Sequence, residues 1–426
     1  MIIKRIYLYH KFLSIASLLL LLFPAAQISG PFLTDFFLIL IAIIFLVIFN
    51  QDKEFIISKI FFFNLFIIFY IFLVTRSIFS DSVMLSLKSS ATYIRFGIFS
   101  LAVFFILKNN KNFIRHFYII LFITLIILLF DGYFQFFTGK NIFGWKNVRP
   151  DRLGGLFFEE LILGSYLSKI LPIFLAFTFI NKKVLNRRYI FLIIFLTYLL
   201  IFLTGERSAF LLSTFYLILI SPFLIKLKKF IIFLILVAVS FSALIFLNKD
   251  IKSRYVDQML THSIYQNQDT VILMPDHIGL FTSAIDIFQK NIFFGSGVKT
   301  FRINCRYTDE NKIISLKKKI PGIVITFCST HPHNYYLQLL AETGITGFLF
   351  IFLIFLKLSF NYLKQMYFLI NNKKEINKSY ICILTGLIVM IWPLTTSGSF
   401  FNNWICSNLF LTIGIYLFIS SNESKN

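Results

Sequence analysis

Long apolar runs alternate with short polar segments along nearly the whole chain. A helix needs roughly 17 to 25 apolar residues to cross a bilayer. Runs of this length occur near residues 12–28, 33–49, 55–74, 91–107, 117–137, 156–180, 189–204, 208–225, 229–247, 334–356, 379–396 and 403–420. Only a helix satisfies all its backbone hydrogen bonds within such a run in lipid. The pattern therefore predicts an all-α integral membrane protein with about twelve transmembrane helices.

One long polar stretch interrupts this pattern. We expect residues 248–333 to form an external loop, which joins nine helices in 1–247 to three helices in 334–426 within a single membrane domain. Apolar residues recur at helical spacing from Asp276 to Gln289, which predicts a short helix in the loop. The sequence Gly295-Ser296-Gly297 then predicts a sharp turn.

The first apolar run ends at Pro24-Ala25-Ala26-Gln27, a sequence that imitates a signal-peptide cleavage site. Cleavage there would leave an odd number of membrane helices and would conflict with the charge pattern of the later loops. We therefore interpret the run as a retained first membrane helix.

Charge changes the picture in two ways. The chain is 58% hydrophobic with a formal net charge of +22, which could indicate nucleic-acid binding. However, the basic residues form short clusters in alternate loops, as the positive-inside rule requires of cytoplasmic loops. This distribution excludes nucleic acid as the expected partner and places both termini in the cytoplasm. The clusters are Lys53; Lys108, Lys111 and Arg115; Lys182, Lys183, Arg187 and Arg188; Lys226, Lys228 and Lys229; and Lys357, Lys364, Lys373, Lys374 and Lys378.

Several arginines fall on the outer side, where no topology rule requires them. Guanidinium groups match phosphate oxygens with two parallel hydrogen bonds, so these arginines indicate an anionic ligand. They are Arg76, Arg95, Arg149, Arg152, Arg207, Arg254, Arg302 and Arg306.

Arg207 and Arg95 each allow two interpretations. Arg207 lies between Glu206 and Ser208 at a nearly loopless helix junction, which favours phosphate binding over a snorkelling membrane anchor. Arg95 lies inside an apolar run, so it needs either a charged partner or a wet cavity. Arg152 precedes Gly154-Gly155, whose missing side chains allow close backbone approach to a ligand.

The stretch His331-Pro332-His333-Asn334 joins the long loop to a very apolar helix. A neutral imidazole is the usual group for removing a proton from a sugar hydroxyl near neutral pH, so His333 is a candidate general base. Alternatively, His333 is an interfacial residue that bonds only to loop backbone. Asn334, Gln338 and Glu342 recur at i, i+4 and i+8, and such a polar stripe on an apolar helix is expected to line a cavity.

The cysteines predict a disulfide, and the absence of metal-binding motifs predicts that no metal takes part. Cys305 and Cys328 share the external loop, where an oxidising environment favours a disulfide that holds the loop beside His331 and His333. The sequence contains no HExxH, DxD or P-loop spacing, and its external acids are scattered. We expect neither a catalytic metal nor another cofactor.

Four segments together resemble the O-antigen ligase and polymerase superfamily. They are Arg152 to Tyr166, Gly205 to Ala209, Gly295 to Phe301 and His333 to Gly347. The last is the most specific, because His-Asn is followed after nine residues by Gly-x-x-Gly.

The resemblance implies a metal-independent, inverting glycosyltransferase of the C-type membrane fold. Such an enzyme lies in the bacterial inner membrane among membrane lipids, with its active site on the periplasmic side. It takes a glycan from undecaprenyl diphosphate and transfers it to a lipid or glycolipid acceptor of the lipid A-core type. The resemblance also implies that His333 is the general base and that Arg207 binds the diphosphate.

One departure from the family pattern concerns the second phosphate contact. A position that is often arginine in the family is His277 here, four residues before Phe281. Either His277 replaces that arginine, or Arg254 or Arg302 supplies the charge. We expect Arg152, Arg95, His331, Asn334, Gln338 and Glu342 to contribute further substrate contacts.

Two other functions compete with an O-antigen ligase. An O-antigen polymerase would use the same donor and a second polyprenyl-linked glycan as acceptor. A polysaccharide or lipid transporter would be expected to show repeated halves, and the sequence shows no internal repeat. A purely structural membrane protein would not explain the outer arginines.

Overall fold

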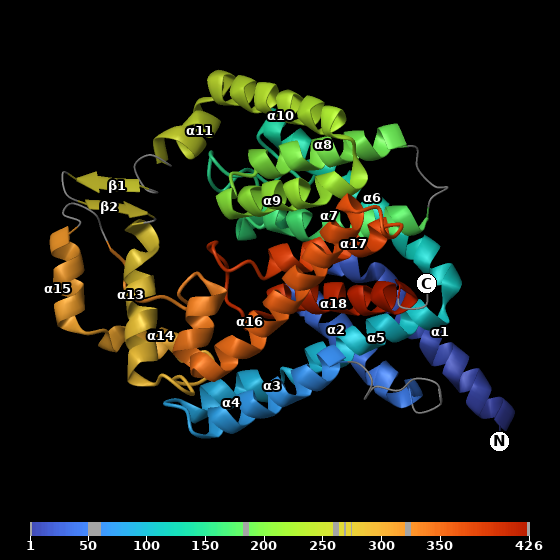
Figure 1. Ribbon diagram of the computed structural model, residues 1–426, viewed down its shortest axis with the longest axis horizontal. Helices are drawn as coiled ribbons and strands as arrows, with labels where there is room; N and C mark the ends of the chain where they lie inside the picture. The colour runs from blue at the N-terminus through green and yellow to red at the C-terminus, as the bar shows by residue number, and fades with distance from the viewer. Residues whose placement is uncertain are drawn as a thin grey trace.

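The computed structural model describes residues 2–49, 61–181, 187–258, 264–267, 270–273, 275–319 and 325–423. It is almost entirely helical, with the membrane helices gathered on one side and a small group of short helices and a hairpin on the other (Figure 1). Ten helices are long and apolar enough to cross a membrane within the described residues. The prediction of an all-α integral membrane protein is confirmed.

The membrane-side helices follow the predicted runs with one exception. They are α1 (Ile2–Ala26), α2 (Pro31–Ile48), α3 (Phe61–Ile78), α4 (Val83–Ala91), α5 (Ile94–Asn109), α6 (Lys111–Thr138), α7 (Leu163–Ile180), α8 (Arg187–Leu203), α9 (Arg207–Leu224), α10 (Leu227–Leu247), α16 (Tyr335–Ile370), α17 (Lys378–Met390) and α18 (Asn403–Glu423). Helix α4 precedes the run at 91–107 and was not predicted. The apolar parts of α8 and α17 are shorter than the ten candidate spans and supply the other two predicted runs. Lys53, Lys182 and Lys183 of the predicted inner loops lie outside the described residues.

The long loop contains small elements of its own. They are α11 (Lys249–Lys252), the π-helical turn η4 (Ser253–Asp257), β1 (Ile264–Asn267), β2 (Thr270–Leu273), α13 (Pro275–Lys290), α14 (Phe301–Asn304), the 3-10 turn η5 (Cys305–Tyr307) and α15 (Glu310–Lys319). Strands β1 and β2 pair antiparallel, with Ile264 opposite Leu273. Helix α13 confirms the helix expected from Asp276 to Gln289, whereas the hairpin was not predicted.

One predicted run begins later than its apolar composition suggested. Helix α7 starts at Leu163, and the preceding residues form the 3-10 segment η3 (Gly155–Glu160). Gly155 and Phe158 both have positive φ, of 56° and 54°, which is incompatible with a continuous α-helix. The glycine pair thus separates Arg152 from α7 by a folded turn.

Small residues let the central helices approach closely. A Cβ atom added to Gly386 of α17 would lie 2.5 Å from the Cβ of Pro172 in α7. Side chains along both helices are mostly buried, including Leu171, Phe174 and Leu384. Close packing of this kind favours association in lipid, where the hydrophobic effect contributes little between helices.

Helix α16 is broken at Gly344, where φ is 63° and ψ is −167°. The carbonyl oxygens of Ala341 and Glu342 accept hydrogen bonds from the amides of Ser296 and Gly297, at 3.0 and 2.8 Å. A Cβ on Gly295 would lie 2.4 Å from the carbonyl carbon of Glu342. The turn Gly295-Ser296-Gly297 after α13, called the glycine turn below, therefore packs directly on the backbone of α16.

We predict that Gly344→Ala destabilises the protein more than Gly139→Ala. Both glycines have positive φ, but a Cβ at Gly139 meets nothing within 4 Å, whereas one at Gly344 would lie 2.5 Å from the backbone of Phe293. Gly139→Ala should cost about 1 kcal/mol; Gly344→Ala adds a backbone clash and should cost about 3 kcal/mol or more. Thermal unfolding of the purified proteins measures the difference, and equal shifts would contradict it.

Candidate active site

Three histidines lie close together where the long loop of residues 248–333, called the loop domain below, meets α16. The ring centroids of His331 and His333 are 4.3 Å apart, and those of His277 and His333 are 5.2 Å apart. His277 is contributed by α13, whereas the other two lie in the turn before α16. His333 has a φ of 56°, a left-handed conformation that histidine adopts more readily than most residues.

The surroundings of His331 and His333 favour neutral imidazoles. Burial, followed by the neighbouring His333, lowers the pKa of His331 to about 4. Burial and the neighbouring His277 also lower the pKa of His333 from its ordinary value of 6.5. The Nδ1 atom of His331 lies 2.9 Å from the Thr330 hydroxyl, and its Nε2 atom is buried without a hydrogen-bond partner. At neutral pH the cluster can therefore accept a proton.

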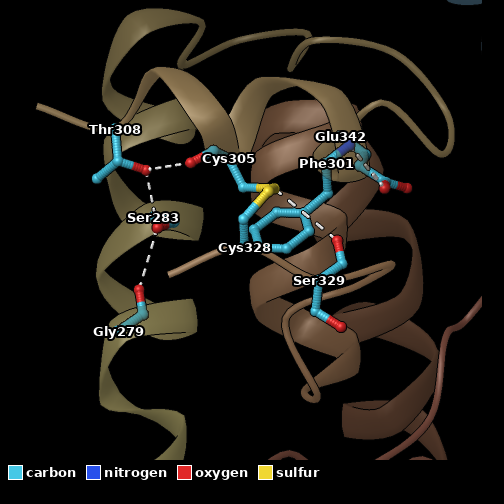
Figure 2. Close-up of a disulfide and its surroundings, with 8 residues drawn as sticks. All are labelled: Gly279, Ser283, Phe301, Cys305, Thr308, Cys328, Ser329 and Glu342. Carbon is cyan, nitrogen blue, oxygen red and sulfur yellow. Dashed lines mark hydrogen bonds between the residues drawn. A yellow bond between two sulfur atoms is a disulfide. The ribbon is translucent and has the colours of Figure 1, made fainter. Parts of the chain in front are cut away.

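A disulfide joins Cys305 and Cys328, the pair expected from the sequence, with their Cα atoms 5.0 Å apart. Figure 2 shows it beside α13, where the Thr308 hydroxyl donates to Ser283 at 2.8 Å and to the Cys305 carbonyl oxygen. Ser283 in turn donates to the carbonyl oxygen of Gly279. The disulfide thus fastens the segment that leads to His331 against the helix that carries His277.

Arginines form a second cluster at the start of α9. Arg207 and Arg254 both donate to Oε1 of Gln258, at 3.3 and 2.9 Å. Nε of Arg254 also donates to the carbonyl oxygen of Gly205, and Asp151 lies 3.6 Å from its Nη1 atom. Burial, then Arg207 and Arg152, lower the pKa of Arg254 to about 10. The neighbouring arginines therefore repel Arg254, and Asp151 offsets part of this repulsion.

Arg152 joins this cluster from the segment before η3. Its Nη2 atom donates to the carbonyl oxygen of Leu161 at 2.9 Å, while its Nε atom is buried without a hydrogen-bond partner. The nearby Glu206 carboxylate is already used, because it accepts from the Gly164 amide at 2.6 Å and from the Ser165 hydroxyl at 2.6 Å. Glu206 thus caps α7, and Arg152 is close enough to act on it electrostatically.

Two further candidate arginines, Arg95 and Arg302, have different surroundings. Arg95 forms two hydrogen bonds with the carboxylate of Asp35, each 3.2 Å long, and stacks on Phe96. Asp35 is therefore the partner that an arginine in an apolar run requires. Arg302 has a buried Nε atom without a hydrogen-bond partner, and its charge acts on His331. Arg302 thus belongs to the histidine cluster.

The polar stripe of α16 bonds within the protein. Asn334 caps α16 by accepting from the Tyr336 and Leu337 amides, and it donates to the carbonyl oxygens of Pro393 and Thr395. Gln338 bonds to the Ser399 hydroxyl, the Phe400 amide and the Glu342 carboxylate.

Glu342 also accepts from the backbone amides of Lys299 and Phe301, at 2.9 and 3.3 Å. The stripe therefore faces backbone of the 391–402 connection and of the glycine turn, whereas the sequence had suggested a cavity. These contacts give Asn334, Gln338 and Glu342 a positioning role, and a direct role in substrate binding stays a prediction.

A hydroxyl-rich segment that the sequence reasoning missed connects the two clusters. The Ser208 hydroxyl, next to Arg207, lies 2.6 Å from the Thr396 hydroxyl. One residue further on, the Ser397 amide donates to the carbonyl oxygen of His333 at 2.8 Å. The run Thr395-Thr396-Ser397-Gly398-Ser399 between two apolar helices could have signalled this connection.

A family model for O-antigen ligase matches residues 190–352. The chain is similar to the O-antigen ligases. This match confirms the resemblance that the motifs indicated, and it covers Arg207, Arg254 and the three clustered histidines. It supports a glycosyltransferase-like enzyme of the ligase and polymerase type. A search of curated proteins found no match.

We predict that breaking the disulfide destabilises the histidine cluster. The disulfide spans a sequence separation of 23, and closing a loop of that size contributes about 3 kcal/mol in the chain-entropy model. Reductant should lower the unfolding temperature of the wild type and leave that of a Cys305→Ser, Cys328→Ser variant unchanged. An equal effect of reductant on both proteins would show that it acts elsewhere.

Proposed function

We propose that the protein transfers a glycan, with inversion, from undecaprenyl diphosphate to a lipid A-core type acceptor at the periplasmic face of the bacterial inner membrane. The main support is the segment Thr396-Ser397, which ties the helix end bearing Arg207 to the turn bearing His333. Such a transfer requires that the anion site and the neutral base are held at a fixed distance and orientation.

The arginine cluster receives the donor diphosphate in this proposal. Arg207 and Arg254 share Gln258, and Arg152 adds a third guanidinium. As the bond between the anomeric carbon and the diphosphate oxygen breaks, its electron pair passes to the leaving undecaprenyl diphosphate. Guanidinium groups already held in place stabilise that growing charge without rearrangement.

His333 acts as the general base. It accepts the proton of the acceptor hydroxyl while the hydroxyl oxygen forms the new bond to the anomeric carbon. A single displacement of this kind inverts the anomeric configuration. The lowered pKa keeps the imidazole unprotonated at neutral pH.

Arg254 is the best supported second phosphate contact. It shares Gln258 with Arg207, and its pKa is lowered in part by Arg207. His277 instead lies against His333, and Arg302 acts on His331. We assign His277 and Arg302 to the surroundings of the base, and Arg95 to its pair with Asp35.

We predict that transfer continues in excess EDTA. In the proposal the arginines supply the positive charge that a divalent metal supplies in other transferases. Transfer by the purified enzyme would be measured with EDTA alone and with EDTA followed by magnesium or manganese. Loss of activity that either metal restores would overturn this part of the mechanism.

We predict that His333→Asn abolishes transfer while the protein remains folded. Asparagine tolerates the left-handed backbone of residue 333 better than alanine does, so the change removes the imidazole with little added strain. Losing a general base typically costs about 10² to 10⁴ in rate. His116→Asn is a matched control, because His116 lies in α6 and bonds to its own helix. Wild-type turnover by His333→Asn would exclude His333 as the base.

The pH profile gives a second measurement on the same base. Only unprotonated His333 can accept a proton, so activity should fall as the pH drops through the pKa of His333. That pKa lies below 6.5. Activity should therefore stay constant from neutral pH down to the pKa of His333 and fall about tenfold per pH unit below it.

We predict that Arg207→Lys lowers turnover roughly ten- to hundredfold. Lysine keeps the charge but loses the planar pair of donors, and a hydrogen bond to a charged group is worth roughly 1.5 to 3 kcal/mol. Arg306→Lys, which changes an exposed residue of η5, is the control. A membrane anchor would tolerate lysine, so near-normal transfer by Arg207→Lys would reduce this residue to a topology role.

A further inference from the structure

A cavity of about 840 Å³ lies between the two clusters without including their charged side chains. It is lined by Ser208 at the start of α9 and by Tyr335 and Ser397 beside His333. Arg152, Arg207 and His333 are not among its lining residues. A ligand in this cavity would therefore sit next to the proposed donor site and the proposed base without occupying either.

The aromatic lining of the cavity is unusual. The chain has three tryptophans, and all of them, Trp145, Trp392 and Trp404, line this one cavity. The Trp404 ring is fixed, because its indole N–H donates to the Gln27 carbonyl oxygen at 3.2 Å. Flat, rigid rings beside serine and threonine hydroxyls suit a sugar, which presents both C–H faces and hydroxyl groups.

Two lysines add positive charge to the cavity wall. The Lys169 ammonium, two turns into α7, lies 5.0 Å from the Trp404 ring centroid and donates to the Ser165 carbonyl oxygen at 3.1 Å. Glu206 is close enough to act on this ammonium electrostatically, but its carboxylate oxygens accept from the Gly164 and Ser165 amides. Lys299, from the glycine turn, also lines the cavity. The lining carries these two lysines and one carboxylate, that of Glu160, and the resulting net positive charge favours an anionic ligand.

The far end of the cavity is apolar. Pro172, Leu212 and Gly386 lie well inside α7, α9 and α17, whereas the hydroxyl groups of Ser208 and Thr396 lie at the helix ends. This gradient from polar to apolar matches an amphiphile whose head lies at the membrane edge and whose chain points into the bilayer.

We propose that this cavity binds the acceptor, a membrane lipid whose head is a sugar carrying phosphate, with Lys169 binding the phosphate and Trp404 packing on the sugar. This assignment rests on the proposed function, in which the arginine cluster binds the donor diphosphate and leaves the cavity to the acceptor. Lys169 and Trp404 thereby set which lipids receive the glycan. They bind the acceptor and take no part in proton transfer.

Intrinsic tryptophan fluorescence tests this directly, because every tryptophan of the chain lines the cavity. Full-length protein in micelles of a sugar-free polyoxyethylene detergent would be titrated with three probes. These are bisphosphorylated diglucosamine lipid A, neutral monogalactosyl diacylglycerol and undecaprenyl diphosphate. We expect the phosphorylated sugar lipid to change the fluorescence and to bind at least tenfold more tightly than the neutral one.

Matched variants identify the contact. Lys169→Met should weaken binding of lipid A at least tenfold, whereas Lys169→Arg should stay within about threefold of the wild type. Lys364→Met changes an exposed lysine of α16 outside the cavity and should have no effect. His333→Asn should still bind lipid A. This variant therefore separates an error in the role of His333 from an error in the acceptor site.

Three outcomes would overturn the proposal. The first is equal affinity for the neutral and phosphorylated sugar lipids, and the second is normal binding of lipid A by Lys169→Met. The third is binding of undecaprenyl diphosphate, but not lipid A, that depends on Lys169. That result would give the cavity to a polyprenyl-linked substrate and favour a polymerase.

Discussion

The contact between the glycine turn and the broken helix α16 is the constraint on which the rest of the site depends. Breaking a helix at Gly344 leaves carbonyl groups without helical partners, and at a membrane edge such groups are costly. The amides of Ser296 and Gly297 satisfy them. The same turn delivers Lys299 and Phe301 amides to the Glu342 carboxylate. Backbone groups on both sides thus fix the loop domain onto the helix that follows His333.

The two polar clusters use burial in opposite ways. Burial and the neighbouring histidines lower the pKa of His331 and of His333, which favours the neutral form that can accept a proton. Arg254 remains charged at neutral pH although it is partly desolvated and repelled by its neighbours. The general base and the positively charged anion site can therefore be held in the same part of the protein without neutralising each other.

The sequence predicted the membrane helices well because burial in lipid imposes a long, unambiguous pattern on each of them. It also predicted helix α13 and the disulfide. It did not predict the pairing of Arg95 with Asp35 or the bond between Ser208 and Thr396, which join residues 60 and 188 positions apart. Polar periodicity identified the face of α16 that carries Gln338 but could not distinguish a cavity from backbone partners. The hairpin β1–β2 is too short to leave a clear alternating pattern.

The disulfide has a consequence for when the site becomes complete. Thiols pair outside the reducing cytoplasm, so in the proposed topology Cys305 and Cys328 can join only after the loop has crossed the membrane. Until then, the segment leading to His331 and His333 lacks its covalent attachment to the α13 side of the loop domain. Oxidation then acts as a maturation step, which ties the assembly of the base to the compartment in which its substrates meet.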